Sequence, residues 1–181
     1  MTLDHLWAGW RSSYISTFDT NGAPAGAADA VAGPAPADGA EPCVFCGIVS
    51  SGEPDEVRHV VWTGDKVSVI MNAYPYAPGH VMVLPIRHVR ELEDLEPDEA
   101  VQLWEAVQAA VAAVKSAYRP EGLNLGVNLG RAAGAGIPAH LHVHVVPRWI
   151  GDTNFMTSLA SVRVLPEALT ESWARLRAAW K

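Results

Sequence analysis

The chain has 181 residues, the size of one domain with an additional segment. Apolar residues make up 49% of it and charged residues 18%, so it can bury a core and is not disordered throughout. Its net charge of −7 argues against non-specific nucleic-acid binding, although a local cluster of donors can still hold a small anion. The sequence contains no run of about 18 apolar residues, so it predicts no membrane span. The N-terminus lacks the basic start and apolar stretch of a secretory signal, so we expect a cytoplasmic protein.

Two segments of different composition precede the main domain. Residues 1–19 form an N-terminal arm that carries Trp7 and Trp10, large side chains that need a surface to pack against. Residues 20–42 are mostly Ala, Gly, Pro and Asp, so they cannot bury enough apolar area to offset the entropy lost on ordering. We interpret them as a flexible linker, and residues 43–181 as the folded domain.

Hydrophobic periodicity predicts the elements of this domain in chain order. Pro97 is typical of the first turn of a helix, and Asp98 and Glu99 favour the positive N-terminal end of that helix. Strands in runs around one long helix indicate an α+β fold with an antiparallel sheet. The predicted strands are 57–62, 66–71, 80–85, 123–128 and 140–147, and the predicted helices are 97–118 and 166–180.

Three histidines alternate with aliphatic residues in the last predicted strand. Because residues two apart on a strand point to the same face, His140, His142 and His144 form a row with neighbours about 6.6–6.8 Å apart along the strand. The residues between them face a core. A row of half-buried, hydrogen-bonded histidines is the structural alternative, and a three-histidine catalytic metal site is another. The third histidine lies too far along the strand for one ion, which disfavours the metal site.

The segment His140-Leu-His-Val-His-Val-Val resembles the signature of the histidine triad family. The resemblance extends to Asn72 and to Pro78-Gly-His-Val-Met-Val, similar to the family's first nucleotide-binding segment. It also includes residues 128–138, similar to the family's approach to the phosphate, and in all it covers residues 43–149. Residues 147–149 and 152–156 resemble the branch that acts on diadenosine polyphosphates, including actinobacterial diadenosine tetraphosphate phosphorylases.

This resemblance implies a histidine-triad fold, with a five-stranded antiparallel sheet, one long helix and a C-terminal helix. It implies that the middle histidine, His142, is the nucleophile and forms a covalent nucleotidyl-histidine, with His144 and His80 beside the phosphate. A neutral imidazole can attack phosphorus when an acceptor holds its second nitrogen. Glycines let backbone N–H groups approach anionic oxygens closely. The other substrate-binding residues that we expect are Asn72, Asn128, Gly134 and Gly136.

The two cysteines, Cys43 and Cys46, are spaced as one half of a tetrahedral metal site. Several bacterial triad proteins, and the related galactose-1-phosphate uridylyltransferases, have a similar set, which here implies a structural zinc held by Cys43, Cys46, His88 and His140. A pair of reduced, partly buried thiols is the alternative. Redox catalysis is disfavoured, because we see no thioredoxin-like pattern of strand, Cys-x-x-Cys and helix.

Two classes of function remain. The first is an enzyme that cleaves diadenosine tetraphosphate-like compounds, passing AMP to water or to inorganic phosphate, or a related purine nucleoside phosphoramidase. The second is a nucleotide-binding or zinc-stabilised interaction module with little turnover. His142 favours the enzyme, because binding alone would not require it. We expect no nucleic acid, membrane or organic cofactor as partner. At least a homodimer is expected, since triad proteins are typically dimers and the apolar residues of 97–118 exceed one packing face.

Overall fold

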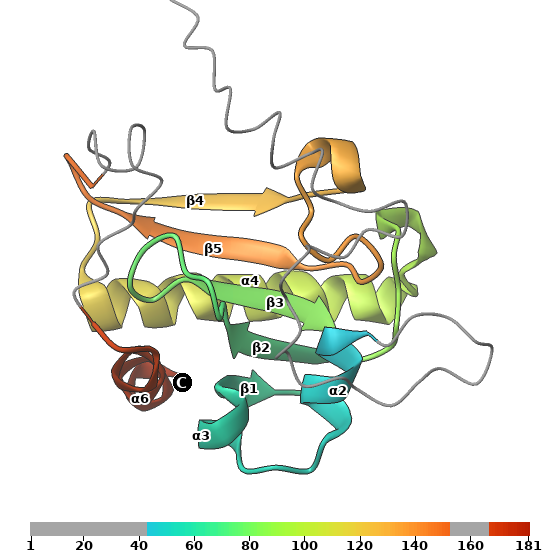
Figure 1. Cartoon of the computed structure of the whole chain (residues 1–181), viewed down its shortest axis with the longest axis horizontal. Helices are drawn as coiled ribbons and strands as arrows, with labels where there is room; N and C mark the ends of the chain where they lie inside the picture. The colour runs from blue at the N-terminus through green and yellow to red at the C-terminus, as the bar shows by residue number, and fades with distance from the viewer. Residues whose placement is uncertain (1–42, 153–166) are drawn as a thin grey trace, which may run out of the picture. The chain divides into compact units, whose positions relative to one another are not determined.

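Five strands form one sheet in the computed structural model of the chain, which describes residues 43–152 and 167–181 (Figure 1). The strand order is β1-β2-β3-β5-β4, and every neighbouring pair is antiparallel. The strands are β1 (Val60–Thr63), β2 (Val67–Met71), β3 (Val81–Pro85), β4 (Gly122–Val127) and β5 (Val143–Arg148). The predicted fold class is therefore confirmed. The expected N-terminal arm and linker, and residues 153–166, lie outside the described residues.

The long helix α4 (Pro97–Tyr118) packs on one face of the sheet, against β2, β3 and β5 (Figure 1). It begins where predicted, because Pro97 lies within a capping box in which the side chains of Glu96 and Glu99 bond each other's backbone N–H groups. It ends before Arg119, whose left-handed φ of 46° closes the last turn, and Pro120 follows. Buried side chains from α4 and the sheet form the main apolar core.

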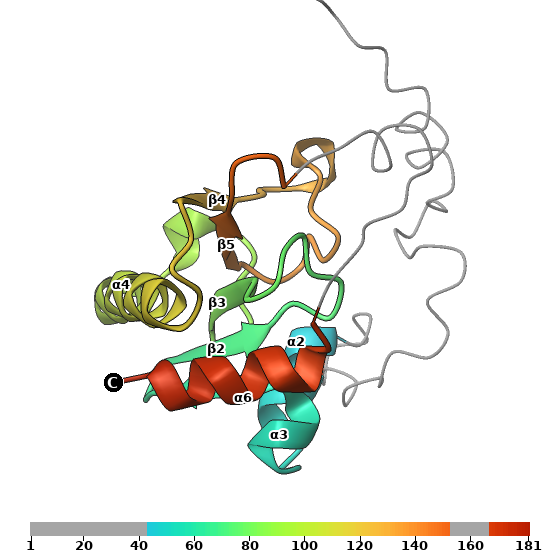
Figure 2. The ribbon, with the colours of Figure 1, turned by 90° about the vertical axis from the view of Figure 1, so that its left-hand side faces the viewer.

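The C-terminal helix α6 (Leu169–Ala179) packs against α4 and β1. Figure 2 shows α6 along its length, below α4 and above α3. Strand β1 is an edge strand, and two side chains of α6 donate to its carbonyl groups. Trp173 Nε1 donates to Val60 O at 2.8 Å, and Arg177 donates to Val61 O at 2.5 Å. The helix thus covers part of an otherwise unpaired edge. In the described part of the chain, no helix combines the length and the apolar character needed to cross a membrane.

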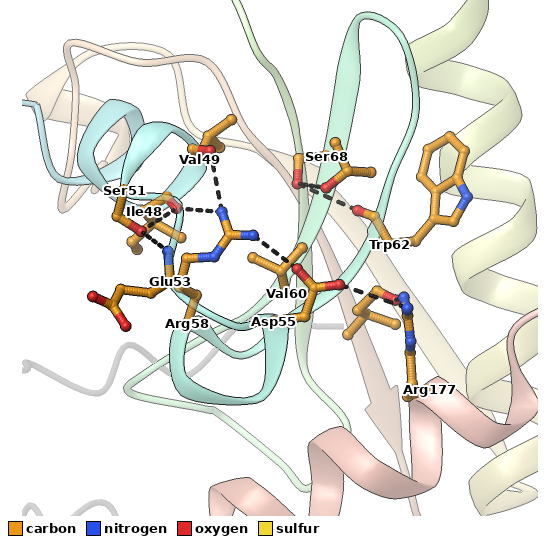
Figure 3. Close-up of polar contacts among 12 residues, drawn as sticks. Ile48, Val49, Ser51, Glu53, Asp55, Arg58, Val60, Trp62, Ser68 and Arg177 are labelled. Carbon is orange, nitrogen blue, oxygen red and sulfur yellow. Dashed lines mark hydrogen bonds and ion pairs between the residues drawn. The ribbon is translucent and has the colours of Figure 1, made fainter.

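Two short helices replace part of what the sequence predicted at the start of the domain. The described elements before β1 are α2 (Val44–Ser50) and α3 (Asp55–Arg58), and the short 3-10 helices are Leu92–Asp94 and Arg131–Ala133. The predicted strand 57–62 begins later than expected, at Val60, because Arg58 pairs with Asp55 one turn earlier and His59 then adopts a left-handed φ of 55°. Arg58 also donates to the carbonyls of Ile48 and Val49, at the end of α2 (Figure 3).

The histidine strand is shorter than predicted, but its two faces differ as expected. Leu141, Val143 and Val145 are buried in the core under α4, whereas the histidines face the opposite side. That side holds a second apolar cluster of Cys43, Phe45, Val60, Ile70, Met82 and Leu84. The ladder between β3 and β5 ends at the pair Val83–Val143. Pro85 has no N–H to extend it, and its carbonyl instead accepts a bond from the His140 ring at 2.8 Å.

Candidate active site

His142 is held in one tautomer by the backbone. Its Nδ1 lies 2.8 Å from the carbonyl oxygen of His140, and because a carbonyl can only accept, Nδ1 carries the proton. The side chain is only 4% exposed, and this burial lowers the pKa of His142, partly offset by the carbonyl. A neutral ring with Nδ1 protonated has its lone pair on Nε2. The geometry therefore gives His142 the form that a nitrogen nucleophile needs.

A chain of hydrogen bonds fixes the tautomers of two further histidines. The backbone N–H of Tyr76 donates to His80 Nδ1 at 3.1 Å, so this neutral ring carries its proton on Nε2. His80 Nε2 donates to His144 Nδ1 at 3.0 Å. Burial lowers the pKa of His144 to about 4, so His144 is neutral at pH 7 and keeps its own proton on Nε2. The rings of His142 and His144 are in contact, with centroids 4.8 Å apart, so a donor nitrogen lies beside His142.

The loop between β2 and β3 supports this chain of hydrogen bonds. Asn72 Oδ1 accepts the backbone N–H of Tyr74 at 2.9 Å, which turns the amide nitrogen of Asn72 towards both His80 nitrogens at 3.4 Å. The centroid of the Tyr76 ring lies 4.7 Å from the centroid of His80. The same ring stacks on His144, with their centroids 6.1 Å apart. The sequence alone indicated no role for Tyr76, because its contact with His144 depends on the pairing of β3 with β5.

The remaining predicted substrate residues lie on the glycine loop and its approach. Asn128 comes one residue after Val127, which pairs with Val143, so it follows β4 at the level of His142. Gly134 is exposed with a positive φ of 88°, and Gly136 is also exposed. Ile137, near the end of the loop, packs against the second apolar cluster. The loop thus returns to the histidine face of the sheet, and its contacts with a nucleotide remain a prediction.

All four predicted metal ligands converge in one cluster. One ligand atom each from Cys43, Cys46, His88 and His140 lies within 4.8 Å of the others, and this group can hold a metal ion. His140 Nδ1 lies 3.4 Å from Cys43 Sγ and 3.6 Å from Cys46 Sγ, and His88 Nδ1 lies 3.2 Å from Cys46 Sγ. Tetrahedral zinc with ligand bonds of about 2.3 Å to sulfur and about 2.0–2.1 Å to nitrogen would require sulfur–nitrogen edges of about 3.5 Å.

The surroundings of the cluster suit a cation. His140 Nε2 donates to the Pro85 carbonyl, so Nδ1 offers its lone pair to the cluster, an arrangement typical of metal-ligating histidines. Burial lowers the pKa of His140 to about 4, which keeps it neutral. Burial, followed by the neighbouring Cys43, raises the pKa of the Cys46 thiol to about 11, and a bound cation would favour the thiolate instead. The donor set therefore fits zinc.

Helix α2 brings one unpredicted residue to the site. In the described chain, α2 begins directly after Cys43, so the helix of a thioredoxin-like redox pattern is present although the sequence did not predict it. Its thiols nevertheless face His88 and His140. Between the cysteines, Phe45 contacts the rings of both His140 and His142. Its position depends on contacts between segments far apart in the chain, which periodicity cannot show.

Residues 53–149 match the sequence profile of the HIT domain family, and the chain belongs to this family. It is 46% identical over 126 residues to the AP-4-A phosphorylase of Mycobacterium tuberculosis, an alignment that covers 70% of this chain and 65% of the relative. It is 36% identical over 81 residues to the asymmetrical bis(5'-nucleosyl)-tetraphosphatase of Schizosaccharomyces pombe, covering 45% of this chain and 44% of the relative. The chain thus spans less than two thirds of the length of these relatives.

Among solved structures, a zinc-bound histidine triad family protein from Mycobacterium smegmatis superposes with a TM-score of 0.61 at 32% identity. The match covers 76% of this chain and 91% of the other. This confirms the histidine-triad fold that the sequence resemblance implied.

Proposed function

We propose that the chain cleaves diadenosine tetraphosphate-like dinucleoside polyphosphates through a covalent nucleotide on His142. One observation carries the proposal: the His140 carbonyl holds His142 Nδ1 at 2.8 Å, leaving a neutral, buried Nε2 as nucleophile. The relatives named AP-4-A phosphorylase and bis(5'-nucleosyl)-tetraphosphatase support this class of substrate.

The reaction is a double displacement at the α-phosphorus. His142 Nε2 forms a bond to that phosphorus, and the bond from phosphorus to the bridging oxygen breaks, so that ATP leaves diadenosine tetraphosphate. The adenylated ring is cationic while it keeps its Nδ1 proton, and the His140 carbonyl stabilises this charge. An oxygen of water or of inorganic phosphate then attacks the same phosphorus, the nitrogen–phosphorus bond breaks, and AMP or ADP is released.

The neighbouring groups are placed to neutralise the phosphate. His144 carries its proton on Nε2, because Nδ1 accepts from His80, and it can donate to a phosphate oxygen beside His142. We assign Asn72 and His80 to binding of the phosphate, where they also hold His144 in position. Asn128, Gly134 and Gly136 complete the proposed nucleotide site, with the glycine loop offering backbone N–H groups to the oxygens.

The proposed metal is a structural zinc. Cys43, Cys46, His88 and His140 would hold it, and its role is to stabilise the fold rather than to take part in the reaction. It would join α2 and the loop after β3 to the start of the histidine segment. The backbone already links two of these parts, since Leu141 N donates to Val89 O at 2.6 Å. The zinc in the mycobacterial structural relative supports this choice of metal.

We further propose a homodimer located in the cytoplasm. Val107 and Val114 of α4 are buried against the sheet, whereas Val101 and Trp104 on the same helix are exposed. Leu125 is also exposed on β4, which is the edge strand at the opposite end of the sheet from β1. An exposed apolar helix face and an exposed edge strand each suit pairing with a second copy of the chain.

Incubation with diadenosine tetraphosphate, with and without phosphate, tests the function. AMP plus ATP identifies a hydrolase, and ADP plus ATP formed only with phosphate identifies a phosphorylase. If this compound, diadenosine triphosphate and an adenosine phosphoramidate all stay intact, the enzyme proposal fails and a nucleotide-binding module replaces it. Turnover of the phosphoramidate alone would instead indicate a nucleoside phosphoramidase.

A further inference from the structure

Phe45 fills the space between the metal-ligand cluster and the nucleophile. It lies between Cys43 and Cys46 in sequence, and its side chain is 2% exposed. Its ring centroid lies 5.6 Å from that of His140 and 5.0 Å from that of His142, with an edge-type geometry in both cases. One buried ring therefore contacts both a proposed metal ligand and the proposed nucleophile.

The orientation of the His142 ring needs a contact of this kind. Rotation about the last side-chain bond of a histidine has a broad, roughly two-fold preference, so the side chain does not select one orientation by itself. Half a turn would remove Nδ1 from the His140 carbonyl and place a C–H group there. Close packing against a rigid neighbour restricts such a rotation, and Phe45 is the aromatic residue of the apolar cluster on this face.

Phe45 is itself fixed at both ends of α2. At the N-terminal end, the Cys43 and Cys46 sulfurs lie in the metal-ligand cluster. At the other end, Arg58 donates to the carbonyl oxygens of Ile48 at 2.8 Å and Val49 at 3.1 Å (Figure 3). A change at the cluster would thus displace the helix that carries Phe45.

We propose that Phe45 is a positioning residue, which keeps Nδ1 of His142 on the His140 carbonyl and links the metal centre to the nucleophile. The inference rests on the proposed role of His142, but its physical content is the orientation of one ring. Loss of the metal would act on His142 through the same side chain. The metal centre would then support catalysis through packing as well as stabilise the fold.

The test uses the full chain with ¹⁵N-labelled histidine, in which NMR reports the tautomer of each ring. In the wild type, His142 should show one state, protonated at Nδ1. Phe45→Leu and Phe45→Met should each give a mixture of tautomers, and so should removal of the metal by a chelator. Ile70→Val is the matched control, because it also removes volume from a buried residue of the same cluster, one that is 1% exposed.

With diadenosine tetraphosphate, kcat of the Phe45 variants should fall about tenfold to a hundredfold with little change in KM, since the ring is misplaced rather than the substrate. The metal content of the Phe45 variants should stay near that of the wild type. The tautomer state, kcat and KM of Ile70→Val should also stay near those of the wild type. A single Nδ1-protonated state of His142 in both Phe45 variants would overturn the inference, and an unchanged His142 signal after chelation would overturn the link to the metal. Because NMR needs no turnover, an inactive wild type would sink the proposed function while the tautomer test still stands.

Discussion

A single methyl group at Gly79 would test how the fold supports the site. Gly79 has a φ of +80°, and a Cβ atom there would lie 2.5 Å from Cε2 of Tyr118. The Tyr118 ring cannot simply move away, because its hydroxyl donates to Glu167 at 2.9 Å and its ring lies against Trp149. The next residue is His80, which orients His144. Gly79→Ala should therefore lower both stability and turnover.

The expected loss of stability has two parts. Placing alanine in the left-handed region costs about 1–2 kcal/mol, and forcing a methyl group against a packed ring costs about 1–3 kcal/mol. The sum of about 2–5 kcal/mol corresponds to a melting temperature lowered by roughly 10 °C for a chain of this size. Any shift of His80 should also lower kcat for diadenosine tetraphosphate about tenfold or more.

Gly52→Ala separates the two parts. Gly52 also has a positive φ, of 71°, but, apart from its own chain neighbours, no atom of the described residues lies within 4 Å of the position that an alanine methyl group would take. It should therefore show the backbone part alone, with turnover unchanged. Thermal denaturation and steady-state kinetics of both variants provide the comparison. If Gly79→Ala melts at the same temperature as Gly52→Ala and keeps full activity, the argued conflict with Tyr118 is absent.

Three further predictions concern the metal, the assembly and the effect of pH. Protein purified without added metal should contain about one zinc per chain, and chelation should lower its melting temperature because binding energy in a structural site is folding energy; metal-free protein with unchanged melting would return the cysteines to a pair of thiols. Light scattering should give at least a dimer for the full chain and for a version lacking residues 1–42, and Trp104→Glu should give a monomer; a monomeric wild type at micromolar concentration would contradict the dimer. Burial lowers the pKa of His144 from 6.5 to about 4, so the unfolded chain binds the proton first and stability should fall as pH drops through this window. Melting temperatures from pH 7 to pH 4 should fall less steeply for His144→Asn, and equal slopes would refute this assignment.

Local sequence signals predicted the parts of the fold whose causes are local. Pro97 and Glu99 set the start of the long helix, and the alternation of His142 with Val143 set the two faces of the last strand. The start of β1 was misjudged, because Asp55 and Arg58 form a helical turn whose ion pair competes with the strand pattern. The later start of the last strand, at Val143 instead of His140, was also missed, since it depends on the missing N–H of Pro85, which lies far before Val143 in the chain.

The candidate site was predicted largely by family resemblance. The resemblance placed Cys43, Cys46, His88 and His140 in one set, and the structure shows that they meet. Neither Phe45 nor the Tyr76 ring was assigned, because their partners come from distant segments. Contacts between side chains of α2, the β2–β3 loop and the histidine segment are a property of tertiary packing, and hydrophobic periodicity alone does not encode them.

The most direct test of the central claim is to look for the nucleotide on His142. Full-length protein is mixed with diadenosine tetraphosphate, quenched during turnover under neutral conditions, and analysed by mass spectrometry of the intact chain and its peptides. We predict one adenylate, located on His142, and its absence from His142→Ala. That variant should fold and bind nucleotide but lose nearly all turnover. Turnover that leaves no adenylate on the wild type, together with more than a few per cent of wild-type activity in His142→Ala, would contradict the covalent mechanism.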